Sequence, residues 1–197
     1  MTTIAAENIN YKEELRRKTS KPLLWVGIAS IVMFFSGLTS AVVVSQGGGS
    51  FLKIDLPFAF TISTIVIVVS SFAFHFGMIS IKKGNLAIAK ISILSTLVLG
   101  MLFVLTQFLG WVELYENGVY AVGSQSTQES SYLYLLTALH IAHLLGGLIS
   151  LIVVLIKTIR EKYSSDNYLG VQVSITYWHF LGGLWIYLFF FLRFIIA

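Results

Sequence analysis

"SYLYLLTALHIAHLLGGLISLIVVLI", residues 131–156, contains no Asp, Glu, Lys or Arg. A helix needs about 20 apolar residues to cross the hydrocarbon core of a bilayer, so this stretch is long enough to span a membrane. Further uncharged apolar stretches lie on both sides of it, at residues 23–45, 56–81, 91–112 and 172–192. Their continuous hydrophobicity is the opposite of the alternation found in a β-barrel wall. The sequence therefore predicts an all-α, polytopic membrane protein with five transmembrane helices.

The composition agrees with this class, because 56% of the residues are hydrophobic and only 11% are charged. The chain contains no cysteine, which excludes disulfides and thiolate metal sites. Its formal net charge of +4 comes from basic residues near the spans. Such residues direct membrane insertion, so the charge does not indicate a nucleic-acid partner.

The distribution of basic residues predicts the orientation. All but two of the 13 Lys and Arg residues precede the first span, separate the second from the third or separate the fourth from the fifth; the exceptions are Lys53 and Arg193. Connections rich in Lys and Arg stay in the cytoplasm, so we expect a cytoplasmic N-terminus and a C-terminus outside. Glu7, Glu13 and Glu14 disfavour a transit peptide, and a multi-pass protein of the bacterial inner (plasma) membrane fits best.

The connections between spans are too short to form a further domain. We expect residues 1–22 to be a cytoplasmic N-terminal segment and residues 23–197 to be one five-helix transmembrane domain. Within the segment, residues 6–18 are expected to form a short helix along the lipid headgroups.

The polar side chains inside the spans are histidines and an amide: His75, Gln107, His140, His143 and His179. No Asp, Glu, Lys or Arg lies in a span interior, which disfavours an ion pathway. His140 and His143 are three residues apart, so we expect them to share a helix face and a common neighbour. A metal or haem site is one interpretation. We favour hydrogen bonds between helices, because no carboxylate or thiolate co-ligand lies at depth.

Small and aromatic residues supply two further expectations. Small residues recur at intervals of four at Ala138, Ala142 and Gly146, and again at Gly37 and Ala41. This spacing predicts that neighbouring helices approach closely there. Five aromatic residues are expected in the belts at the membrane surfaces, namely Trp25, Trp111, Tyr115, Trp178 and Tyr187.

Three motifs, in this order along the chain, indicate a family: "IDLPFAFTISTIVIVVSSFAFH" through the second span, "TALHIAHLLGG" in the fourth and "YWHFLGGLW" in the last. Together they resemble subunit III of the haem-copper terminal oxidases, in its five-helix form. The final-helix pattern is matched by Tyr177, Trp178, His179, Phe180 and Trp185. The fourth-span pattern is matched by Thr137, His140 and His143, and single family positions by Gln107 and His75.

The resemblance implies a non-catalytic subunit of a cytochrome c oxidase, with no catalytic, cofactor-binding or metal residue of its own. Haems and copper would belong to subunits I and II. This chain would pack on subunit I, contact subunit II and other subunits, stabilise subunit I, support its proton uptake and hold phospholipid in a cleft. The candidates for helix-interface or lipid-cleft positions are Gln107, His140, His143, Trp178 and His179.

Two departures from the family pattern concern carboxyl groups. Ile31 stands where the family often has an intramembrane glutamate, and Gly182 stands where the final helix has an acid. A role of those carboxyls in proton pumping therefore does not carry over to this chain. Other functions remain open: a subunit III of a quinol oxidase or of a nitric oxide reductase-linked complex, a small transporter, or a haem protein using His140 and His143.

Overall fold

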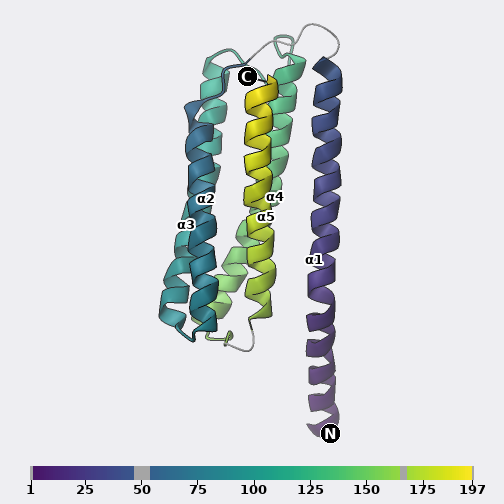
Figure 1. The fold of residues 1–197 in the computed structure, drawn as a ribbon, viewed down its shortest axis with the longest axis vertical. Helices are drawn as coiled ribbons and strands as arrows, with labels where there is room; N and C mark the ends of the chain where they lie inside the picture. The colour runs from purple at the N-terminus through teal and green to yellow at the C-terminus, as the bar shows by residue number, and fades with distance from the viewer. Residues whose placement is uncertain (1, 47–53, 165–167, 197) are drawn as a thin grey trace.

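The computed structural model describes residues 2–46, 54–164 and 168–196. Five long helices make up the fold, and a short π-helical segment follows them (Figure 1): α1 Thr2–Gln46, α2 Phe58–Lys82, α3 Leu86–Glu116, α4 Gln128–Ile159, α5 Leu169–Phe191 and Leu192–Ile196. Each long helix contains an apolar segment long enough to cross a membrane. Over the described residues the chain has no strand, and the predicted all-α class with five membrane-spanning helices is confirmed.

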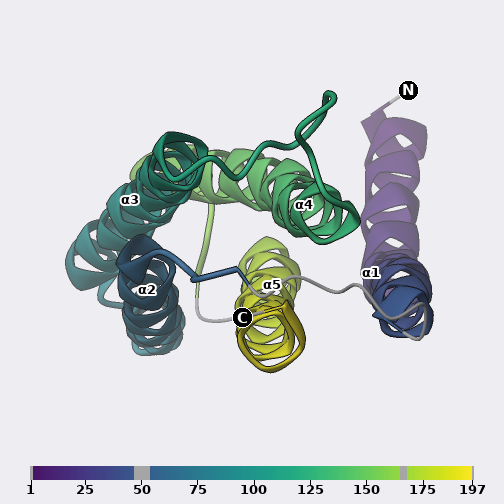
Figure 2. The ribbon, with the colours of Figure 1, turned by 90° about the horizontal axis from the view of Figure 1, so that it is seen from above.

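Helices α2 to α5 form a four-helix group, and α1 stands at its side (Figure 2). α2 and α3 are joined by a tight turn in which Gly84 has a φ of +75°, a left-handed conformation that suits glycine. Close to this turn Gly77 lets α3 approach, because an added Cβ would lie 3.2 Å from the Cβ of Ser92. At the other end Gly110 accommodates the ring of Phe60.

The connection from α3 to α4 is fixed by side chains of α4. Tyr134 donates a hydrogen bond to the carbonyl of Val119 (3.0 Å), and Ser130 donates one to the carbonyl of Tyr120 (2.7 Å). Thr127 caps α4 by accepting from the Ser130 amide, which satisfies one of the free N–H groups at the start of the helix. These contacts set how α4 begins and which of its faces meets α3.

Basic connections gather at one end of the bundle, which we call the basic end. The turn after Lys82 and the connection after Ile159 both lie there, and Lys90 at the start of α3 forms an ion pair of 3.1 Å with Glu161. The N-terminal part of α1 extends past the same end (Figure 1). The grouping that the sequence predicts for basic residues is therefore present in space.

Helix α1 contacts the bundle mainly through its C-terminal half. Tyr187 of α5 donates to Thr39 (3.0 Å), and the ring of Phe35 lies 5.6 Å from that of His143 on α4. At the basic end a groove lies between α1, α2 and α5. Residues 6–18 belong to the same continuous helix as the first span, so the expectation of a separate short helix there is wrong.

Candidate functional site

Gln107 is fully buried on α3 and faces α2. Its amide nitrogen donates a hydrogen bond of 2.7 Å to Ser63 Oγ. Ser63 in turn donates to the carbonyl of Phe60. The amide therefore joins two helices in surroundings where lipid offers no competing hydrogen bond.

His140 is buried within the four-helix group, between rings of α3 and α5. Its ring centroid lies 5.9 Å from that of Phe103 and 5.2 Å from that of Trp185. Neither ring nitrogen has a hydrogen-bond partner among the described residues, and the same holds for Oε1 of Gln107. Three buried polar atoms thus have no hydrogen-bond partner in the part of the chain that the structure describes.

His143 lies on another side of α4. Its ring packs against Phe35 of α1, and its Nδ1 lies 2.7 Å from the carbonyl oxygen of Leu139. Tyr177 of α5 donates to the carbonyl of His143 (3.2 Å). Tyr177 and Trp185 place α5 near both residues, but the two imidazole rings have different neighbours, Phe103 and Trp185 for His140 and Phe35 for His143. The expectation of a common neighbour for the two side chains is therefore wrong, because three residues along a helix turn a side chain by about 60° from its starting direction.

Trp178 fills the centre of the group and is not a belt residue. It is completely buried, and its Nε1 donates to Ser70 Oγ on α2 (3.1 Å). Its ring lies against the backbone of two glycines: a Cβ added to Gly100 on α3 would come within 2.7 Å of it, and one added to Gly147 on α4 within 3.2 Å. The belt prediction is wrong for Trp178, because its indole N–H has a partner inside the bundle and does not need the membrane surface.

Ser63 and Ser70 were not among the predicted site residues, although their spacing along α2 indicates that they are buried. They belong to a buried face of α2 whose members recur every three or four residues: Phe60, Ser63, Ile67, Ser70 and Phe74. This spacing places all five on one side of a helix. A serine on such a face is positioned to receive a hydrogen bond from a neighbouring helix.

The predicted small-residue seams do not lie at helix contacts. Ala138, Ala142 and Gly146 are exposed on α4, and Gly37 has no neighbour within 4 Å of an added Cβ. Close approach occurs instead at Gly77, Gly100, Gly110 and Gly147. The interval of four is present, but the bundle uses other faces of these helices.

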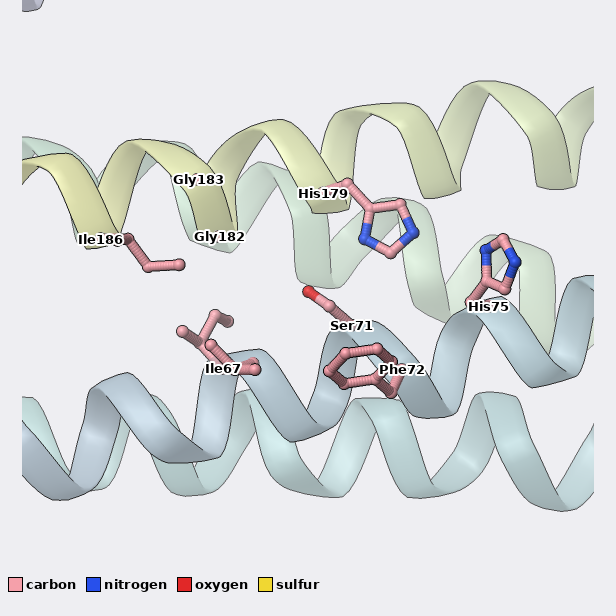
Figure 3. A pocket seen from close by; sticks show the side chains of 9 residues that line it. Ile67, Ser71, Phe72, His75, His179, Gly182, Gly183 and Ile186 are labelled. Carbon is pink, nitrogen blue, oxygen red and sulfur yellow. The ribbon is translucent and has the colours of Figure 1, made fainter.

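His179 and His75 line a groove between α5 and α2. Their ring centroids lie 6.1 Å apart, and Figure 3 shows the two rings facing each other across the gap between the helices. Away from the basic end, along α2 and α5, the groove is apolar and has a volume of about 420 Å³; its lining includes Ile67, Phe72 and Ile186. Gly182, at the family's acid position, lies there opposite Ser71.

The same groove continues to the basic end and changes character. A second section of about 430 Å³ shares His75 and His179 and is also lined by Lys21 and Trp25 of α1 and Lys82 of α2. The two lysines were not among the predicted site residues. They are recognisable only in the fold, where α1, α2 and α5 line one groove, since the two lysines are far apart in the sequence.

The histidines do not gather into a metal site. In residues 2–46, 54–164 and 168–196 no three His, Asp or Glu side chains lie close enough together to hold a metal ion. The candidate site therefore has two parts: a layer of buried polar side chains inside the bundle, and an open groove on its surface that carries Lys21 and Lys82 at the basic end.

Comparison with known proteins identifies relatives along nearly the whole chain. The family model "Cytochrome c oxidase subunit III" matches residues 24–196. "Cytochrome c oxidase subunit 3" of Corynebacterium diphtheriae is 29% identical over 178 residues, which cover 86% of this chain and 85% of the relative. "Probable cytochrome c oxidase subunit 3" of Mycobacterium leprae is 31% identical over 169 residues, covering 83% and 82%. "Cytochrome c oxidase subunit 3" of Alkalihalophilus pseudofirmus is 31% identical over 159 residues, covering 79% and 73%.

Proposed function

Because the chain belongs to the cytochrome c oxidase subunit III family, as its motifs predicted, we propose that it is the non-catalytic membrane subunit III of a respiratory haem-copper oxidase. In this role it packs on subunit I, contacts subunit II, stabilises subunit I and supports its proton uptake during oxygen reduction. The haems and copper belong to those partner subunits. The family match over residues 24–196 carries this proposal.

The buried polar groups are consistent with a supporting role. Three hydrogen bonds of 2.7–3.1 Å connect α2 to its neighbours, from Gln107 to Ser63, from Trp178 to Ser70 and from Trp185 to Thr64. Each such bond contributes about 0.6–2 kcal/mol to helix association in a bilayer. We therefore assign Gln107, His140 and Trp178 to the inner helix interfaces, His143 to the contact with α1, and His179 to the groove.

The location follows from the same proposal. The chain is a multi-pass membrane protein, and we place it in the bacterial plasma membrane with its basic end in the cytoplasm. Lys82, Lys90, Lys157 and Arg160 all lie at the ends of helices that meet there. A cytoplasmic position for them agrees with the positive-inside rule.

Co-purification tests the assembly directly. A tagged full-length chain, solubilised in mild detergent, is expected to bring down a large subunit with haem and copper absorbance together with its electron-donor subunit. The control is an unrelated five-span protein with the same tag. A chain that purifies without a haem protein, or that itself retains a Soret band after separation from all partners, would overturn the proposal.

His143→Leu is expected to weaken the docking of α1 and the yield of assembled oxidase, while the haem spectra stay unchanged. The substitution removes the ring that contacts Phe35, and no haem ligand is lost in the proposed assembly. Yield is measured by blue native electrophoresis, and the spectra by reduced-minus-oxidised difference absorbance. Leu145→Ala, at an exposed position of the same helix, serves as the control. A shifted haem band in His143→Leu would contradict the assignment.

The groove between α1, α2 and α5 is proposed to hold a phospholipid. Its mouth carries Lys21 and Lys82, and its inner section is apolar, an arrangement that suits a phosphate group followed by an acyl chain. From Lys82 to Ile67 the helix rises by about 22 Å. One bilayer leaflet with its headgroups is about 20–22 Å thick, so the groove has the length of one lipid.

A paired substitution tests the lipid site. Lys21→Gln with Lys82→Gln is expected to lower several-fold the amount of anionic phospholipid that remains bound through detergent purification, because both phosphate partners are removed. Bound lipid is measured by mass spectrometry of extracts. The control is Lys83→Gln, the next residue along the chain, which does not line the groove. Equal retention in both variants would exclude the groove as the site, and a partner helix found there by cross-linking from Trp25 would replace lipid as the occupant.

A further inference from the structure

A layer of polar side chains crosses the four-helix group in otherwise apolar surroundings. Trp111 Nε1 donates to Thr137 Oγ1 (3.1 Å), Gln107 Nε2 to Ser63 Oγ (2.7 Å) and Trp185 Nε1 to Thr64 Oγ1 (3.0 Å). All four helices from α2 to α5 contribute to it. Three buried side-chain atoms have no hydrogen-bond partner among the described residues: Gln107 Oε1, His140 Nδ1 and His140 Nε2.

The register of α3 and α4 brings Gln107 and His140 to the same level along the bundle. The two helices run antiparallel, and Trp111 meets Thr137. One turn from this contact, towards the basic end, lies Gln107 on α3 and His140 on α4. The contact between His140 and Phe103, one further turn along α3, places the imidazole beside the segment from Phe103 to Gln107.

A direct hydrogen bond between the two residues is not present, and no other residue of the described ranges supplies a partner. Inside a bilayer neither bulk water nor lipid chains can satisfy a buried polar group, so an unpaired one is costly. A neutral imidazole offers one N–H donor and one acceptor nitrogen, whereas the amide oxygen only accepts. The group that joins them must therefore donate to the amide oxygen, and it can either accept from the ring N–H or donate to the other ring nitrogen; water can do both.

We infer that one ordered water molecule bridges His140 and Gln107. It accepts the imidazole N–H and donates to Gln107 Oε1, which gives it polar partners of the kind that hold buried waters in proteins. The hydrogen bonds then run from Ser63 on α2 through Gln107 on α3 and the water to His140 on α4. The neutral amide and imidazole suit water better than a metal ion, because within the described ranges no group of three His, Asp or Glu side chains that could hold a metal lies here. This inference does not depend on the proposed oxidase role.

Proton-detected solid-state NMR tests the bridge. The full chain is labelled with ¹⁵N-histidine and embedded in lipid bilayers with the subunits that co-purify with it. The chain has 4 histidines, so the His140 signals are assigned by their loss in His140→Phe. We expect magnetisation transfer from water protons to the His140 ring. The transfer should remain when a relaxation filter removes the signal of bulk water, because the bridging water is ordered. No transfer from water to the wild-type ring would overturn the inference, whichever variants fold.

Two variants identify the second partner of the water. Gln107→Met keeps the side-chain length and removes the amide, so the transfer to His140 should be lost. Ser63→Ala is the matched control, because it removes the partner of Gln107 Nε2 and leaves Oε1 in place; the transfer should remain. Variants are compared only if their helical circular dichroism equals that of wild type. Unchanged transfer in Gln107→Met, or a ring ¹⁵N shift that a chelator abolishes, would show that a different contact or a metal occupies the site.

Discussion

Trp178→Ala is expected to destabilise the bundle by about 3 kcal/mol, the lower end of the range for deleting a buried tryptophan. The indole touches three other helices, through Ser70 on α2, Gly100 on α3 and Gly147 on α4. Lipid solvates apolar groups nearly as well as the protein interior does, so the loss comes mainly from packing contacts, the cavity and the hydrogen bond.

The effect is measured as the change in the free energy of unfolding in mixed micelles, followed by circular dichroism. Trp25→Ala is the control, because Trp25 is 61% exposed in this chain, and its removal should change stability by less than about 0.5 kcal/mol. Trp178→Phe keeps most of the volume and loses the N–H, and it serves if the alanine variant does not fold. Equal effects of Trp178→Ala and Trp25→Ala would contradict the central position of Trp178.

Gly100→Ala is expected to destabilise the bundle although alanine is the better helix former. The added Cβ would lie 2.7 Å from the ring of Trp178 and 2.9 Å from Leu148. The ring is completely buried and packs against α2, α3 and α4, so a shift of the ring would disturb contacts with three helices. Overpacking of this kind costs about 1–3 kcal/mol.

Gly146→Ala supplies the matched comparison for Gly100→Ala. The Cβ added at Gly146 would meet only the Tyr177 hydroxyl, at 3.7 Å, which is an ordinary contact. Both variants share the intrinsic gain of about 1 kcal/mol for replacing a helical glycine. The difference between their unfolding free energies, from the same micelle titration, therefore isolates the steric cost. A Gly100→Ala variant as stable as Gly146→Ala would mean that the helices separate more easily than the described packing allows.

The five helices and the family could be predicted from the sequence because both depend on local signals. Hydropathy over some 20 residues reports whether a segment can cross a membrane, and the motifs around His140 and His179 keep their order along the chain. The ends of the helices were less predictable: α3 begins at Leu86, ahead of the expected residue 91. Helices continue past their apolar cores, because N–H and C=O groups remain paired inside the helix whatever the side chains.

The neighbours of each helix face could not be predicted in the same way. His140 and His143 belong to one motif, yet one faces Phe103 and Trp185 and the other faces Phe35. Ala138 and Gly146 have the spacing of a packing seam and are exposed, whereas Gly100 and Gly147 receive Trp178. In an apolar helix every face is hydrophobic, so hydropathy does not distinguish the face that meets protein from the face that meets lipid.

The sequence by itself determined that this is a membrane protein, how many membrane-spanning helices it has and to which family it belongs. Each of these depends on the composition of single segments and on the order of motifs along the chain. Only the tertiary structure decided that Trp178 is central, that Lys21 and Lys82 share a groove and that Gln107 lies level with His140. The physical reason is that packing in a bilayer depends on shape and hydrogen-bond partners across helices, which are brought together from distant parts of the chain.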